Sequence, residues 1–143
     1  MDILLVEDSS SDAYLIKELF TKTDDPPMVH WVVDGYHALD YVFRRREYKE
    51  ASRPDIILLD LNLPRISGYE VLKELKKTPP FANIPVIILT TSTAPLDHSQ
   101  CMALGADVCL SKPHRLKDYE DLVRLLMEWA NVQLAMVGRQ SAH

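Results

Sequence analysis

Apolar and polar residues alternate along the chain in blocks that predict five strands and five helices. The strand-like blocks are short apolar runs at residues 3–6, 29–33, 56–59, 86–89 and 108–110. Three of these runs lack the polar alternation of a half-exposed strand, which is typical of strands covered by helices on both faces. The pattern therefore predicts a parallel sheet between two helical layers, joined by right-handed crossovers.

Helical periodicity fills the segments between the runs. Apolar residues three or four positions apart form one stripe in each of the first three segments: Leu15, Ile16, Leu19 and Phe20; Leu39, Val42 and Phe43; Val71, Leu72 and Leu75. Paired prolines end the first and third of these helices. Three successive serines could each cap the first helix: Ser9, Ser10 and Ser11. A fourth helix, at residues 95–104, carries little apolar surface.

The fifth helix, expected at residues 116–137, is apolar on two faces. One face holds Leu122, Leu125, Leu126 and Trp129, and the other holds Val123, Met127, Ala130, Leu134 and Val137. A helix on the surface of a sheet needs only one apolar stripe. The helix could lie deep in the core, but we favour a second face that packs on another subunit, because the apolar residues continue past the length that a small domain needs.

Composition restricts the class of protein. The chain has 143 residues, of which 47% are hydrophobic and 26% charged, as expected of one soluble domain. Its net charge of −5 argues against nucleic acid as a partner. No apolar run approaches the roughly 20 residues that span a bilayer, and no basic leader precedes the first run. Cys101 and Cys109 are expected to be free thiols. We therefore expect a cytoplasmic protein with no membrane partner, a domain at residues 1–137, a frayed tail at 138–143 and no output domain.

Residues able to do chemistry follow the predicted strands. Glu7 and Asp8 follow the first strand, Asp60 the third, Thr90 ends the fourth, and Lys112 follows the fifth. Ligands bind at this carboxyl edge of parallel sheets. Any one of these residues has an ordinary structural explanation, such as a cap, a turn or a solvated charge. Three carboxylates held together, however, require a cation. Oxygen-only ligands with room for a phosphate favour Mg²⁺.

Asp60 is the candidate nucleophile. It ends the most apolar strand, and a carboxylate beside a metal ion can attack phosphorus to form an acyl phosphate. Lys112 and Thr90 can then offset charge on the phosphoryl oxygens, which is the main requirement of phosphoryl transfer.

These residues resemble a known family. The set formed by Glu7-Asp8, Asp60, Thr90 and Lys112-Pro113 resembles the receiver domain of bacterial response regulators, over essentially the whole chain. The resemblance implies a flavodoxin-like (βα)5 fold, an α/β doubly wound parallel five-stranded sheet in the order 2-1-3-4-5. It also implies a two-component switch protein that accepts a phosphoryl group on Asp60 from a sensor histidine kinase.

A narrower resemblance concerns residues 34–35, 41–45, 53–64 and 89–92. They are similar to the stand-alone response regulators that pair with cyanobacterial and bacterial phytochromes. This resemblance implies a phytochrome histidine kinase as the partner, a role in light signalling, and a homodimer formed through the last strand and helix. The two apolar faces of the fifth helix agree with such a dimer.

The resemblance also implies roles for single residues. Asp8 and Asp60 bind Mg²⁺ directly, Asn62 binds it through its backbone carbonyl, and Glu7 binds it through water. Thr90 and Lys112 contact the phosphoryl group.

The resemblance further implies that Asn62 and Ser92 flank the phosphoryl group and influence its hydrolysis.

The chain departs from the family pattern in the predicted fifth strand. Cys109 stands where many receivers carry a Tyr or Phe that rotates on phosphorylation, and a small thiol cannot replace that rotation. We therefore expect the signal to depend on dimer geometry or loop motion.

Two other functions fit the sequence less well. An aspartyl-nucleophile phosphatase or phosphotransferase normally has a second acid two residues after the nucleophile, but this chain has Asn62 there and no cap domain. A degenerate receiver acting as a scaffold would lack an acidic residue, the phosphoacceptor or the lysine, and this chain has them all. We therefore expect a phosphorylated switch and no enzyme.

Overall fold

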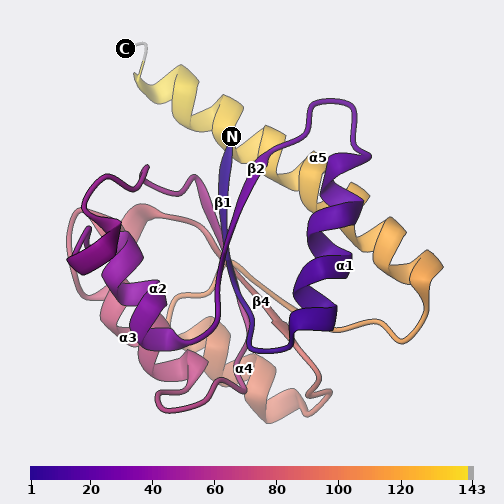
Figure 1. The fold of residues 1–143 in the computed structure, drawn as a ribbon, viewed down its shortest axis with the longest axis horizontal. Coiled ribbons are helices and arrows are strands. Elements are labelled where there is room, and N and C mark those ends of the chain that lie inside the picture. Colours follow the sequence, from indigo (N-terminus) through magenta and orange to yellow (C-terminus); the bar gives the residue numbers. More distant parts are fainter. Residues whose placement is uncertain (142–143) are drawn as a thin grey trace.

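A computed structural model describes residues 1–141 and shows a sheet between two helical layers (Figure 1). The strands are β1 (Asp2–Val6), β2 (Met28–Val32), β3 (Ile56–Leu59), β4 (Val86–Thr90) and β5 (Val108–Ser111). Every neighbouring pair is parallel, and the order is β2-β1-β3-β4-β5. The flavodoxin-like order implied by the resemblance is therefore confirmed.

The helices divide between the two faces of the sheet. They are α1 (Ser10–Thr21), α2 (Gly35–Val42), α3 (Gly68–Lys76), α4 (Pro95–Ala103) and α5 (Leu116–Ser141), with short 3₁₀ helices η1 (Arg46–Tyr48) and η2 (Phe81–Asn83). Helices α1 and α5 cover one face, and α2, α3 and α4 cover the other (Figure 1). No helix within residues 1–141 is long and apolar enough to cross a membrane.

Two apolar cores follow from this arrangement. Successive residues of a strand point to opposite faces, so Ile3 and Leu5 enter the core beneath α1 and α5, while Leu4 and Val6 enter the core beneath α2 and α3. All four are buried. Burial on both faces explains why the central strands read as continuous apolar runs.

Side-chain caps fix where three helices begin. The Ser9 hydroxyl accepts a hydrogen bond from the Asp12 amide at 3.3 Å, so Ser9 is the cap among the three candidate serines. Asp34 caps α2 and Ser67 caps α3 in the same way. Each cap satisfies an amide that the first helical turn leaves unpaired. Helices α1, α2 and α3 thus all begin at the carboxyl edge of the sheet.

Helix α5 has the two apolar faces that its sequence indicates, with a changed membership. Tyr119, Val123, Leu126, Met127 and Ala130 are buried in the core. The outward stripe contains Leu125 (59% exposed), Val132 (57%) and Met136, together with Leu122 and Trp129, which are half-buried and also pack against the core. The sequence had grouped Leu126 with Leu122, Leu125 and Trp129, but the structure packs it in the core with Val123, Met127 and Ala130.

The end of α5 differs from the expected domain limit. The helix continues to Ser141, past the expected end at 137. The side chain of Val137, which the sequence assigned to one apolar face, and residues 142–143 of the expected tail lie outside the described residues.

Candidate functional site

The carboxyl edge of the sheet gathers the acidic residues singled out in the sequence. Glu7 and Asp8 lie just past β1, and Asp60 lies just past the neighbouring strand β3. One carboxylate oxygen from each of the three lies within 4.8 Å of the others. Glu7 and Asp60 are buried, whereas Asp8 is exposed and gives the cluster an open side.

Lys112 supplies the positive charge at this edge. Its ammonium Nζ lies 2.7 Å from Glu7 Oε2, 3.1 Å from Asp60 Oδ2 and 3.1 Å from Asp12 Oδ2. The side chains of Lys112 and Asp60 are each 5% exposed. One buried ammonium is therefore shared among three carboxylates, and a fourth, on Asp8, stands beside them.

The excess of negative charge shifts the pKa values of the buried groups. Burial raises the pKa of Glu7 to about 7, with a further contribution from the charge of Asp60, although Lys112 opposes the change. Burial acts to lower the pKa of Lys112, but the hydrogen bond and charge of Glu7 and the charge of Asp60 outweigh it and raise that pKa. Both shifts indicate a site with too little positive charge.

The ligand chemistry of this cluster fits a hard divalent cation. Glu7, Asp8 and Asp60 each offer carboxylate oxygen atoms, which Mg²⁺, Mn²⁺ and Ca²⁺ prefer over nitrogen or sulfur. A cation there would offset the burial and the charge of Asp60, which together raise the pKa of Glu7.

The loop after β3 holds Asp60 in place. The amide of Asn62 donates to Asp60 Oδ1 at 3.1 Å, and the amide of Asp60 donates to the Val6 carbonyl at 3.2 Å. The loop then folds back so closely that a Cβ at Gly68 would overlap the backbone carbonyl oxygen of Asp60. Asn62 is exposed and its side chain donates to Thr91 Oγ1. Coordination through the Asn62 carbonyl stays a prediction.

Thr90 lies at the end of β4 and is fully buried. Its hydroxyl oxygen accepts a hydrogen bond from the Ser92 amide at 3.3 Å, and its carbonyl accepts one from the Lys112 amide at 2.6 Å. The second of these bonds ties the end of β4 to the residue after β5. Thr90 and Lys112 are thus adjacent at the same edge as Asp60.

Asp12 is a member of the site that the sequence did not identify. An acidic residue in the first turn of a helix has an ordinary role there, because it is stabilised by the helix N-terminus. The structure places its carboxylate against Lys112 Nζ. The position of Asp12 in the chain could have identified it, because the first turn of α1 closely follows the end of β1 and so lies at the carboxyl edge of the sheet.

The two cysteines are free thiols, as expected. Cys101 is buried in α4 and Cys109 is half-buried in β5, and the thiols lie beside each other. Burial raises the pKa of Cys101 to about 12 and also raises that of Cys109. Thiols with raised pKa values are poor nucleophiles, so neither is a candidate for catalysis.

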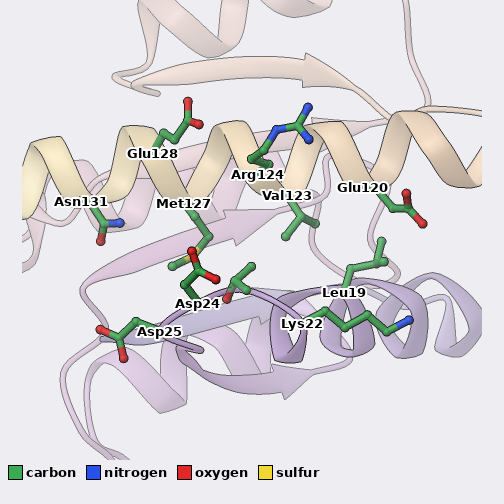
Figure 2. Close-up of a pocket in the computed structure, with 11 residues that line it drawn as sticks. Leu19, Lys22, Asp24, Asp25, Glu120, Val123, Arg124, Met127, Glu128 and Asn131 are labelled. Atoms are coloured by element: carbon green, nitrogen blue, oxygen red, sulfur yellow. The ribbon is translucent and has the colours of Figure 1, made fainter.

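A separate hollow lies between α1 and α5 (Figure 2). Its volume is about 510 Å³, and Val123 and Met127 of α5 point toward α1 within it. Lys22 and Asp24 lie at the end of α1, away from the carboxyl edge of the sheet. None of the residues of the acidic edge lines this hollow, so it is not part of the candidate site.

Comparison with known proteins agrees with the geometry. Residues 3–124 match the protein family described as the response regulator receiver domain. The response regulator Rcp1 of Synechocystis sp. is 41% identical over 123 residues, which cover 85% of this chain and 83% of Rcp1.

Solved structures of similar sequence have the same fold. The phosphorylated cyanobacterial phytochrome response regulator RcpA superposes with a TM-score of 0.85 at 39% identity, covering 90% of this chain and 91% of RcpA. The Mn²⁺-bound form of Rcp1 gives 0.81 at 38%, covering 85% and 88%. Response regulator RPA3017, in red light signalling of R. palustris, gives 0.80 at 30%, covering 87% and 90%. With the strand order and the acidic edge, these matches show that the chain belongs to the family of response regulator receiver domains.

Proposed function

We propose that this chain is a phosphorylation switch in which Asp60 accepts a phosphoryl group from a histidine of a sensor kinase. The observation that carries the proposal is the position of Asp60, buried between the carboxylates of Glu7 and Asp8 and the ammonium of Lys112. A carboxylate in an acidic cluster with one shared cation is suited to bind Mg²⁺ and a phosphoryl group together.

The transfer has a simple balance of bonds. A carboxylate oxygen of Asp60 attacks the phosphorus of phosphohistidine, the O–P bond forms, and the P–N bond breaks while the imidazole nitrogen keeps the electron pair. Lys112 donates to one phosphoryl oxygen and Thr90 to another, which stabilises their charge in the transition state. Neither residue forms a covalent bond. We expect phosphorylation and dephosphorylation of Asp60 itself and no turnover of an outside substrate.

Mg²⁺ is the proposed cofactor. Asp8 and Asp60 would hold it directly, Asn62 through its backbone carbonyl and Glu7 through water. When bound, the ion supplies positive charge for the phosphoryl oxygens. Support comes from the oxygen-only cluster and from the Mn²⁺ bound by Rcp1, because Mn²⁺ and Mg²⁺ prefer the same ligands.

The proposed kinase is a phytochrome, and the proposed place of action is the cytoplasm. The support for this partner is similarity to RcpA, a phytochrome response regulator, and to RPA3017, which acts in red light signalling. Light would then control phosphorylation of Asp60. The net charge of −5 supports the proposal that nucleic acid is not a partner.

The proposed output is a change in assembly through β5 and α5. The outward stripe of α5 repeats at intervals of three and four residues, which is the spacing that packs one helix on another. A second copy of the chain would present the same stripe, as a two-fold dimer requires. Exposed apolar side chains such as Leu125 and Val132 would be covered in this dimer.

Phosphotransfer with labelled ATP tests the main proposal. Label should pass from a phytochrome kinase to the wild-type chain in the presence of Mg²⁺ and should not pass to Asp60→Asn. Asp118→Asn, an exposed acid in the first turn of α5, is the matched control and should be labelled normally. Label on Asp60→Asn, or no label on the wild type from any kinase or from acetyl phosphate, would contradict the proposal.

Sedimentation tests the dimer. Leu125→Glu combined with Val132→Glu places charge on the outward stripe and should yield monomers where the wild type is a dimer. Leu96→Glu, on the exposed surface of α4 (67% exposed), is the matched control. Equal sedimentation of the stripe variant and the wild type would exclude α5 as the dimer surface.

A further inference from the structure

The loop between β4 and α4 is fastened by a carboxylate that the proposed chemistry does not use. Asp97, in the first turn of α4, accepts a hydrogen bond from the Ser92 hydroxyl on one oxygen at 2.5 Å. Its other oxygen accepts one from the Tyr69 hydroxyl at 2.8 Å. Asp97 therefore joins the loop at Ser92 to helix α3 at Tyr69.

The backbone of Ser92 is held from further sides. Its carbonyl oxygen accepts a hydrogen bond from the Ser111 hydroxyl of β5 at 3.1 Å, and His98 Nε2 of α4 lies 3.2 Å from the same oxygen. The amide of Ala94 donates to the Ser92 hydroxyl at 3.2 Å. The position of Ser92 is thus set jointly by α3, α4 and β5.

Ser92 in turn orients Thr90. The amide of Ser92 donates to the Thr90 hydroxyl oxygen. A hydroxyl has one proton to donate and two positions that accept. Because the Ser92 amide occupies an accepting position, the proton of Thr90 is left to be donated elsewhere, and the direction of that donation depends on where Ser92 is held.

The ring of Tyr69 lies near Cys109, a β5 position that carries no aromatic side chain in this chain. Its hydroxyl is beside the thiols of Cys101 and Cys109, and its pKa is raised by burial and by the hydrogen bond to Asp97. Cys109 is the β5 position at which many receivers carry an aromatic ring. In this chain the ring of Tyr69 reaches the vicinity of Cys109 from α3. Tyr69 follows Gly68, which packs on the backbone of Asp60.

We propose that Asp97 and Tyr69 are positioning residues for Thr90, which together hold Ser92 so that the Thr90 hydroxyl can donate to a phosphoryl group on Asp60. The inference rests on the proposed function. It places the aromatic contribution to the site on α3 instead of β5, and it connects the first turn of α3 to the loop after β4. Preorganised donors of this kind cost no rearrangement at the moment of reaction.

Binding of beryllofluoride with Mg²⁺ tests the proposal, because this tetrahedral anion mimics a phosphoryl group on a carboxylate. Affinity can be measured by fluorine nuclear magnetic resonance. Tyr69→Phe removes one hydrogen bond and should weaken binding about fivefold, and Asp97→Ala removes two and should weaken it about thirtyfold. Tyr14→Phe, an exposed tyrosine on α1, is the matched control and should bind as the wild type does.

A double-mutant cycle separates positioning from general loosening of the fold. Thr90→Val removes the hydroxyl through which the two residues are proposed to act, so adding Asp97→Ala to it should cause no further loss of affinity. Thr90→Ser keeps the hydroxyl and should keep the dependence on Asp97.

Each outcome decides the matter. If the wild type fails to bind beryllofluoride, the proposed function fails and this inference with it. If the wild type binds and Asp97→Ala binds as tightly as Tyr14→Phe, the proposed function stands and the inference is wrong. An equal loss from Asp97→Ala with valine or with threonine at position 90 would show a structural effect and would also overturn the inference.

Discussion

Two sets of buried carboxylates stand at strand ends in this protein, and they differ in the number of donors around them. Asp34 follows β2 and is 5% exposed. It accepts from the His37 amide at 2.8 Å and from Arg65 at 2.6 Å, and His37 Nδ1 lies 2.8 Å from it. Glu7 and Asp60, at the ends of β1 and β3, each accept from one backbone amide, that of Ser9 or of Asn62, and they share the single ammonium of Lys112.

The difference appears in the pKa values. Burial acts to raise the pKa of Asp34, but the hydrogen bonds from His37 and Arg65 lower it to about 2. Burial raises the pKa of Glu7 to about 7 in spite of Lys112. The fold therefore favours the charged form of Asp34 and disfavours that of Glu7. A carboxylate with enough donors is a structural cap, and carboxylates with too few form a site that attracts a cation.

The strongest test of this comparison removes Lys112, whose ammonium the carboxylates of the acidic edge share. Lys112→Ala leaves three carboxylates without their shared partner and should lower the free energy of unfolding by about 4 kcal/mol at neutral pH without divalent metal. Millimolar Mg²⁺ should restore part of the loss because it binds the folded state. Urea unfolding measures both. Lys117→Ala, at an exposed position, should change stability little, and equal stability of the two variants would contradict the prediction.

Removing the structural carboxylate should have the next largest effect. Asp34→Ala loses the cap of α2 and leaves Arg65 without its partner, so we expect a loss of about 3 kcal/mol in the same measurement. In contrast to Lys112→Ala, Mg²⁺ should restore none of it. Recovery of stability by Mg²⁺ would show that Asp34 belongs to the metal site after all.

Acid should remove the contribution of Asp34 separately. Its pKa in the folded protein, about 2, lies below its ordinary value of 3.8, so the charged form stabilises the fold above that ordinary value. This contribution, on the order of 2 kcal/mol, is lost as the pH falls from about 4 toward 2. Asp34→Asn should show less decline than the wild type in unfolding measurements over this range. Parallel curves would contradict the lowered pKa.

Neutralising Glu7 should have the smallest effect and the opposite sign. Because the folded-state pKa of Glu7 lies above its ordinary value of 4.5, its contribution to stability falls as the pH rises from 4.5 through 7. Glu7→Gln should therefore raise the free energy of unfolding by about 1 kcal/mol at pH 8 without metal, after the weaker bond to Lys112 is allowed for. Glu18→Gln, exposed on α1, is the control. A loss of stability would contradict the charge excess.

The sequence predicted the fold well because its central strands are buried on both faces. Each residue of β3 and β4 is buried, so these strands are unbroken apolar runs that are easily found. Edge strand β2 has only Val32 fully buried, and its bounds were predicted one residue too far along the chain. Helix α4 was found at the expected place, and its small apolar content reflects the burial of Cys101 alone.

The site was predictable only where chain position determines location. Glu7, Asp60 and Lys112 follow strands, and parallel strands end at one edge. The contact between Tyr69 and Asp97 joins residues from different helices, and no pattern in the neighbouring sequence predicts it. The outward stripe of α5 was found as a second apolar face, but its membership depends on the rotation of the helix about its axis, which the sequence did not determine.

The three acceptors around Lys112 limit how a phosphoryl group can enter the site. An ammonium carries three protons, and Glu7, Asp60 and Asp12 already provide one acceptor for each. An arriving phosphoryl oxygen can bind Lys112 only by displacing one of these carboxylates or by sharing its proton. Asp12 is the most exposed of the three, at 32%, and it belongs to the first turn of α1. If the proposed phosphoryl group displaced Asp12, the exchange of ligands at one nitrogen atom would free the first turn of α1 from its contact with Lys112.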